Sequence, residues 1–298
     1  MSQYILHLLV LGGIYVILAA SLNLTVGLSG QVSLGHGAFF GIGAYASALM
    51  SMQAPALPFS VLILFSGLTA MVAALVISPP ALKLRDEYLA VVTLGLGIIF
   101  ELWLKNCDFT GGPDGLYGLS NFGLSTPELA IRIWAVAALC LILTWRMSTG
   151  MFGTNLTAVK ENEGTARAMG ISPFPLKALC FAASALFAGM AGSLYAHYIT
   201  FISPGAFGLH TSILLLCMVV LGGMGTVFGP VVGAVVLFLL PEFLQEFADF
   251  QDLVYGLLLV LTLIFRPQGI LGRTGTTPGF SGRLLALLRI RRLPERGC

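Results

Sequence analysis

Long apolar runs recur along the chain, separated by short polar or glycine-rich breaks. A helix needs about 20 mostly apolar residues to cross a bilayer, and nine runs approach that length. The pattern therefore predicts an all-α, polytopic transmembrane helix bundle of about nine spans, with eight or ten also compatible. The second, seventh and ninth runs are short enough to be tilted, paired or partly re-entrant. The expected spans are Tyr4–Val26, Gly37–Met52, Leu57–Ser78, Tyr88–Lys105, Leu129–Met147, Phe174–Tyr198, Thr211–Met224, Phe228–Phe247 and Leu253–Phe265.

The distribution of charge predicts how this bundle is oriented. Cytoplasmic loops of membrane proteins are enriched in lysine and arginine. With the N-terminus outside, the inner segments and their edges hold 13 of the 15 lysines and arginines. The outer loops instead carry Asp108, Asp114, Glu128, Glu242, Glu246, Asp249 and Asp252. We therefore expect the N-terminus outside and the C-terminus in the cytoplasm.

Composition supports a membrane class and excludes several others. The chain is 57% hydrophobic and 9% charged, whereas soluble domains carry about 25% charged residues. A net charge of +2 gives no indication of nucleic-acid binding. The five cysteines are scattered singly and predict packing residues rather than a metal site or a cofactor site. The first apolar run reads as a retained span rather than a signal peptide.

Two units follow from these patterns. Residues 1–272 form the expected transmembrane domain, which includes a long cytoplasmic loop at 153–173. Residues 273–298 form a basic tail, and Arg283–Leu293 reads as an amphipathic helix lying along the anionic inner leaflet. No polar stretch is long enough to bury a soluble core of its own.

Polar residues interrupt the apolar pattern between the first two spans. Irregular backbone at membrane depth must be satisfied by protein or line a wet cavity. This first break is therefore a candidate border of a solute path, with a tight turn at the inner face as the alternative. Its candidate path residues are Asn23, Ser29, Gln31, Ser33 and His36.

A second glycine-rich break joins the seventh and eighth expected spans. It contributes Gly222, Gly223 and Thr226 as candidate path residues. Both breaks are entered in the same direction and lie at the same expected face, which suggests a weak internal repeat. Facing breaks in two halves of a transporter can frame a transport path.

The cytoplasmic loop contains a short stretch with helix-forming content, Glu161 to Met169. Gly170 is a plausible C-cap and Pro173 a stop signal. An apolar side is expected from Ala158, Val159, Ala166, Met169 and Ile171. Such a helix suits docking into a groove of a soluble partner, and a solvated connector is the alternative.

Six ordered motifs resemble those of the LivM-type permeases of branched-chain amino acid ABC transporters. They include GQVSLGH at residues 30–36, TGGPDG at 110–115 and FRPQGILG at 265–272, together with residues 84–90, 160–171 and 221–231. The resemblance runs from about residue 15 to residue 272. Because the motifs occur in a consistent order, their combination is far more specific than any one of them.

The resemblance implies an importer in the bacterial cytoplasmic membrane, assembled from several kinds of chain. The implied partners are a second related permease, two cytoplasmic ATP-binding subunits and a periplasmic solute-binding protein. The implied ATPase-coupling residues are Glu161, Glu163, Ala166, Arg167 and Gly170. Relatives often have a second alanine beside the glutamate, where this chain has Gly164 and Thr165.

The chain shows no energy-converting site of its own. None of its four lysines is followed by Ser or Thr, so no phosphate-binding GxxxxGK[ST] loop is present. Glu101 and Lys105 are spaced as an interfacial ion pair rather than an ion relay. We therefore expect a transport subunit without catalytic residues, and not an enzyme.

Three other functions remain open from the sequence. One is a permease for urea or short amides, and another is a stand-alone channel or secondary transporter. A membrane serine protease is suggested by Gly27–Gly30, which matches GxSG, but His197 and His210 lie at the other expected face. Only His36 could reach Ser29.

Overall fold

The computed structural model describes residues 2–82, 86–123, 125–243, 256–257, 260–261 and 269–272. Nearly all of its regular structure is helical, as the apolar periodicity predicts. The elements in chain order are α1 (Ser2–Asn23), the π-helix η1 (Leu24–Leu28), α2 (His36–Gln53), α3 (Phe59–Ala81), α4 (Asp86–Asn106), the 3₁₀ turns η2 (Asp108–Thr110) and η3 (Gly112–Asp114), β1 (Leu116–Tyr117), α5 (Thr126–Ser148), α6 (Gly150–Glu161), α7 (Glu163–Ala168), α8 (Pro173–Ile199), β2 (Phe201–Ile202), η4 (Pro204–Phe207), α9 (Leu209–Gly222) and α10 (Gly229–Phe243).

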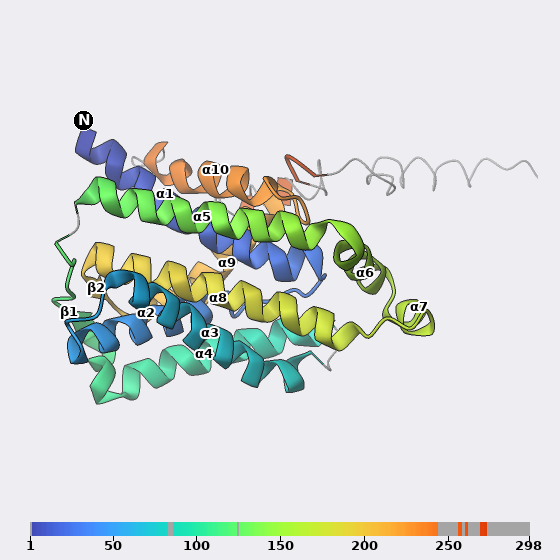
Figure 1. The fold of residues 1–298 in the computed structure, drawn as a ribbon, viewed down its shortest axis with the longest axis horizontal. Helices are drawn as coiled ribbons and strands as arrows, with labels where there is room; N and C mark the ends of the chain where they lie inside the picture. Colours follow the sequence, from blue (N-terminus) through green and yellow to red (C-terminus); the bar gives the residue numbers. More distant parts are fainter. Residues whose placement is uncertain are drawn as a thin grey trace, which may run out of the picture.

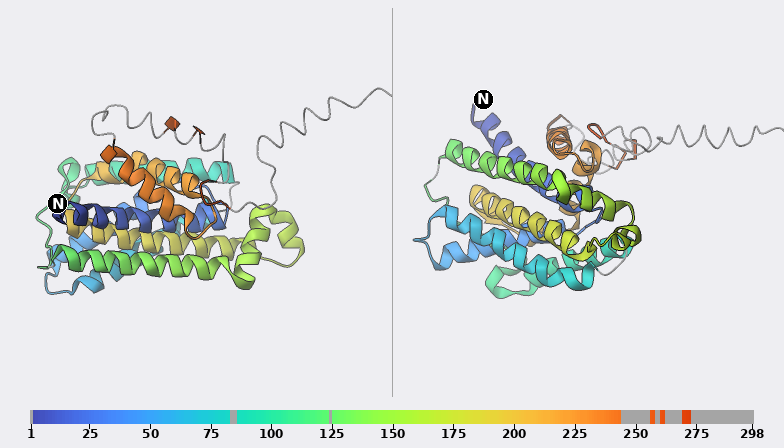
Figure 2. Two further views of the ribbon diagram at one scale, coloured as in Figure 1. Left: turned by 90° about the horizontal axis from the view of Figure 1, so that it is seen from above. Right: turned by 45° about the vertical axis from the view of Figure 1, so that its right-hand side comes forward.

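The long helices lie side by side in one bundle, and the two ends of this bundle differ (Figure 1). The short helices α6 and α7 project from one end, which we call the α6–α7 end (Figures 1 and 2). The opposite end carries the 3₁₀ turns and a two-residue antiparallel ribbon, in which Leu116 pairs with Ile202 and Tyr117 with Phe201. Both glycine-rich breaks lie at the α6–α7 end, because α1 and α9 run toward it and α2 and α10 run away from it.

Among the described residues, six segments are long and apolar enough to cross a membrane, so the protein is a multi-pass membrane protein. The expected second and eighth spans form the helices α2 and α10, but neither is among these six. The expected ninth span, Leu253–Phe265, lies almost wholly outside the described residues, as does the 273–298 tail. The six segments are Gln3–Leu28, Phe59–Ala81, Tyr88–Asn106, Thr126–Ser148, Pro173–Ile199 and Pro204–Gly222.

Helix α8 forms the centre of the bundle and packs closely against α2 and α3. A Cβ atom added at Gly189 would lie 2.5 Å from the Ser66 carbonyl oxygen and 2.6 Å from the Ala70 Cβ. One added at Gly192 would lie 2.6 Å from the Ala44 nitrogen. Small residues let helix backbones approach closely where lipid supplies no hydrophobic drive for association. Gly189 and Gly192 therefore mark close contacts of α8 with α3 and α2.

A buried polar cluster ties α8 to α2 at the end opposite α6 and α7. His197 Nε2 lies 2.8 Å from Ser47 Oγ, and its Nδ1 lies 2.8 Å from the Ser120 carbonyl. Ser47 Oγ in turn lies 2.7 Å from Ser193 Oγ.

The expected ion pair is also confirmed, since Lys105 Nζ is 2.6 Å from Glu101 Oε1. Among the described cysteines Cys140, Cys180 and Cys217 are free and buried, as packing residues would be.

The packing predicts that Gly189→Ala lowers the thermal unfolding midpoint in detergent. The added methyl must displace helix α3, and overpacking of this kind costs about 1–3 kcal/mol. Gly95→Ala is the matched control, because a Cβ at Gly95 meets nothing within 4 Å and alanine favours the helix by up to about 1 kcal/mol. Equal midpoints for the two variants would contradict the proposed α3–α8 contact.

Candidate functional site

The first break begins with an irregular helical turn. Helix α1 ends at Asn23 and continues as the π-helix η1, after which residues 30–35 form no regular helix. A π-helix is rare and is often found at functional sites. The peptide N–H of Gln31 donates to the carbonyl oxygen of Thr25 (2.9 Å), which folds the chain back on the turn. The predicted irregular backbone is therefore present and is held by the chain itself.

The side chain of Asn23 joins the two breaks to each other. Its Nδ2 donates to the carbonyl oxygen of Thr226 (2.9 Å), and its Oδ1 accepts from the N–H of Gly225 (2.9 Å). Asn23 is fully buried, so both bonds replace hydration that the amide has lost. Gly27 lies directly against this bridge, since a Cβ there would collide with the Asn23 side chain and the Gly225 nitrogen.

Lys160 brings helix α6 to the same point. Its Nζ donates to the carbonyl oxygen of Gly27 (2.7 Å), and its Cγ would lie 2.9 Å from a Cβ at Gly30. Part of the side chain is exposed, yet burial by the surrounding protein lowers the pKa of the ammonium group. A hydrogen bond from a charged donor is worth about 1.5–3 kcal/mol when buried, and partial exposure reduces this.

These contacts define one site, which we call the polar junction. It consists of Asn23, Gly27, Gly30, Lys160, Gly225 and Thr226. Three segments far apart in the sequence meet there: the first break, the end of α6 and the second break. Sequence reasoning selected Asn23 and Thr226 but missed Lys160, whose partner is 133 positions away.

The second break is a compact turn rather than an open loop. Thr226 Oγ1 donates to the Gly223 carbonyl (2.9 Å) and accepts from the Gly229 N–H (3.1 Å) at the start of α10. The segment 269–272 returns to this turn, where the N–H of Leu271 donates to the carbonyl of Gly222 (2.9 Å). The FRPQGILG motif is thereby partly explained, because its last residues cover the second break.

The remaining candidate path residues are packed inside the chain. Ser29 Oγ donates to the Thr25 carbonyl (2.8 Å), and His36 Nε2 lies 2.9 Å from Ser21 Oγ. Ser29 and His36 thus form hydrogen bonds with other groups and not with each other, which argues against the protease alternative. The side-chain amide of Gln31 and the Ser33 hydroxyl are buried without a hydrogen-bond partner among the described residues.

An apolar cavity of about 240 Å³ borders the first break at Gly35. Its walls are mainly apolar side chains of α2, α4 and α8, including Phe39, Phe100 and Phe181. In the part of the chain that the structure describes, no group of three or more His, Cys, Asp or Glu could hold a metal ion.

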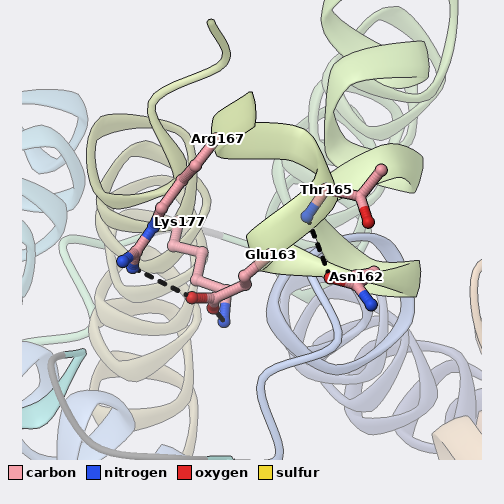
Figure 3. Close-up of polar contacts among 5 residues, drawn as sticks. All are labelled: Asn162, Glu163, Thr165, Arg167 and Lys177. Carbon is pink, nitrogen blue, oxygen red and sulfur yellow. Dashed lines mark hydrogen bonds and ion pairs between the residues drawn. The ribbon is translucent and has the colours of Figure 1, made fainter. Parts of the chain in front are cut away.

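The loop at 153–173 differs from the expected single helix. The expected helix from Glu161 to Met169 is wrong at its start, because α6 already begins at Gly150 and breaks at Asn162. Asn162 caps the second helix, α7, with its Oδ1 accepting from the Thr165 N–H (3.0 Å) (Figure 3). The asparagine interrupts the helix because its side chain competes for a backbone donor. The predicted end is confirmed, since α7 stops at Ala168 and α8 starts at Pro173.

Part of the expected apolar face of this loop is buried against the chain itself, and part of it is exposed. Val159 and Ala166 are only 2% and 1% exposed and pack against this chain, whereas Met169 is 73% exposed. Glu163 forms ion pairs with Arg167 (3.2 Å) and with Lys177 of α8 (Figure 3). The pair with Lys177 holds α7 on the end of α8, beside a hollow lined by Arg167 and residues 170–174. Of the other predicted coupling residues, Glu161 is exposed at the end of α6, and Gly170 borders the hollow.

Interrupted apolar segments in two parts of a helix bundle are found in membrane transport proteins. The chain belongs to the family described as branched-chain amino acid transport system / permease component, whose model matches residues 4–263. No solved structure matches it.

Three relatives illustrate the range of this similarity. The permease protein LivM of the high-affinity branched-chain amino acid transport system of Escherichia coli (strain K12) is 38% identical over 88% of this chain and 68% of its own length. The corresponding LivH of Salmonella typhimurium is 26% identical over 88% of this chain and 92% of its own length. The autoinducer 2 import system permease protein LsrC of Klebsiella pneumoniae is 30% identical over 69% of this chain and 64% of its own length.

The bridge between the breaks predicts that Asn23→Ala destabilises the protein by about 2 kcal/mol, since two hydrogen bonds of about 1 kcal/mol each are lost. The effect is measured as a lower thermal unfolding midpoint in detergent. Asn106→Ala is the control, because that exposed side chain also donates to a carbonyl, that of Leu102 (2.7 Å). Its expected cost is below about 0.5 kcal/mol. Similar unfolding midpoints for Asn23→Ala and Asn106→Ala would contradict a stabilising role of the Asn23 bridge.

Proposed function

We propose that the chain is a membrane-spanning permease subunit of an ABC importer in the bacterial cytoplasmic membrane. It moves branched-chain or other hydrophobic amino acids inward, and partner ATPases supply the energy. The observation that carries this proposal is the 38% identity to a permease named for branched-chain amino acids, over 88% of the chain. The six membrane-length helices and the family membership support it.

The proposed orientation places the α6–α7 end in the cytoplasm, with the N-terminus outside and about nine spans. Basic side chains at that end support it, namely Arg146, Lys160, Arg167 and Lys177. The opposite end carries Glu101, Asp108, Asp114 and Glu128, with Lys105 and Arg132. This asymmetry matches the positive-inside rule. In this orientation the permease domain is 1–272, and the basic tail 273–298 would meet the inner leaflet.

The proposed assembly contains a second related permease, two cytoplasmic ATP-binding subunits and a periplasmic solute-binding protein. Helices α6 and α7 are the proposed coupling element because they project from the bundle and expose Met169 beside the hollow at residues 170–174. Glu163 would act indirectly, by holding α7 against Lys177. The Glu163–Lys177 ion pair thus attaches α7 to the first turns of α8.

The experiment that tests this function is purification of the tagged chain from native membranes in mild detergent, with identification of the chains that accompany it. Recovery of a second permease and two ATP-binding subunits supports the proposal. Recovery of this chain alone, with transport that needs no ATP, would favour the channel or secondary-transporter alternative. Competition of the uptake by leucine and by urea separates the amino-acid reading from the amide reading.

The coupling element yields a sharper prediction for the same purification. Met169→Asp should reduce the recovered ATP-binding subunits by at least about tenfold, because a carboxylate placed in an apolar contact costs more than about 1.4 kcal/mol. The exposed position leaves the fold intact. Met52→Asp is the control, since Met52 is 56% exposed near the opposite end of the bundle. Full recovery of the ATP-binding subunits with Met169→Asp would show that they do not dock at Met169.

A further inference from the structure

Three observations coincide at the polar junction. Asn23 clamps the two breaks together, Gly27 leaves no space between them, and Lys160 reaches the same turn from α6. Helix α6 is followed at once by α7, whose capping residue Asn162 is two positions after Lys160. A movement of α6 and α7 is therefore transmitted directly to the carbonyl oxygen of Gly27.

We propose that the polar junction is the inner gate of the solute path, and that Lys160 is the positioning residue through which α6 and α7 hold this gate shut. This inference rests on the proposed function, because it assigns the two breaks to a transport path. The described conformation is then the one with the inner gate closed.

The contact of Lys160 is suited to a switch. The bond from Nζ to the Gly27 carbonyl is 2.7 Å long, and N–H···O hydrogen bonds in proteins span about 2.7–3.2 Å. A displacement of α6 that carries Nζ out of this range breaks the bond. The released ammonium can be hydrated, because part of the Lys160 side chain is already exposed.

The first break also contains groups that a second conformation would satisfy. The Gln31 amide and the Ser33 hydroxyl are buried and unpartnered among the described residues, which is unfavourable in a closed, dry segment. The preceding π-helix holds an extra residue in its turn, so its return to α-helix would rotate the following residues by about 100°. Such a rotation would change the surroundings of Gln31 and Ser33 as the breaks separate.

The gate is tested by the reactivity of a single cysteine in the assembled transporter. Ser33→Cys is introduced after the five native cysteines are replaced by alanine. This reporter disrupts no described hydrogen bond, because the Ser33 hydroxyl has none. Its labelling by a small membrane-permeant maleimide is measured in native membranes without ATP, in combination with each variant of Lys160.

Lys160→Met removes the donor and keeps the length of the stem, and should raise the labelling rate about tenfold, as expected when one charge-assisted hydrogen bond biases a two-state gate. Lys160→Arg retains a charged donor and should stay within about threefold of the unchanged lysine. Lys105→Met, which removes a lysine at the opposite end, should have no effect. An unchanged rate with Lys160→Met would overturn the gate, as would an equal increase with Lys105→Met.

A second readout separates the failure of the gate from the failure of the proposed function. In the purified complex, Lys160→Met should raise the number of ATP molecules hydrolysed per solute transported, because the gate no longer follows α6. If ATP-binding subunits do not accompany the chain, the proposed function fails, whereas the labelling rates still decide the gate. If they do accompany it and neither the labelling nor the ratio changes, the gate alone is wrong.

Discussion

The amide of Asn23 is the contact on which the arrangement of this end of the bundle depends. Asn23 lies at the start of the first break, and its side chain bonds to two backbone groups of the second break. It accepts from the N–H of Gly225 and donates to the carbonyl oxygen of Thr226. Each break is irregular backbone, which is tolerated at membrane depth only where protein or water satisfies its polar groups. The single buried side chain of Asn23 thus satisfies backbone polar groups of the second break. This requires the close approach of the two breaks, which the absence of a side chain at Gly27 allows.

The rest of the bundle supports this contact by rigid packing. Helix α8 lies against α2 and α3 through Gly189 and Gly192. At the opposite end His197 contacts the Ser47 hydroxyl, the Ser120 carbonyl and the ring of Phe59. These contacts leave little freedom in the centre. Conformational change is therefore expected where the hydrogen bonds are few and partly exposed, as at Lys160, rather than among the interlocked glycines.

Much of the fold was predictable because span length and polarity are local properties. Eight expected spans correspond to helices, with bounds that differ by only a few residues. The end of the helix in the loop at 153–173 was also predictable, since Gly170 and Pro173 are local stop signals. The helix break at Asn162 was not predictable, because an asparagine can either cap a new helix or lie within a continuing one. Val159 and Ala166 are buried on either side of this cap, and their burial depends on the folded chain.

The polar junction illustrates what the sequence could not supply. Asn23 and Thr226 were recognisable as polar residues in apolar surroundings, but their pairing spans 203 positions and requires the folded bundle. Lys160 resembles any lysine of a cytoplasmic loop until its partner carbonyl is known. The burial of Gln31 and Ser33 without partners is likewise a property of one conformation, which no residue pattern encodes.

The most direct test of the central claim is uptake by the purified assembly reconstituted into lipid vesicles, with the solute-binding protein on one side and ATP on the other. The account predicts saturable accumulation of a branched-chain amino acid that requires ATP and is diminished by Met169→Asp. Equal uptake by this chain alone, without ATP or any partner, would contradict it.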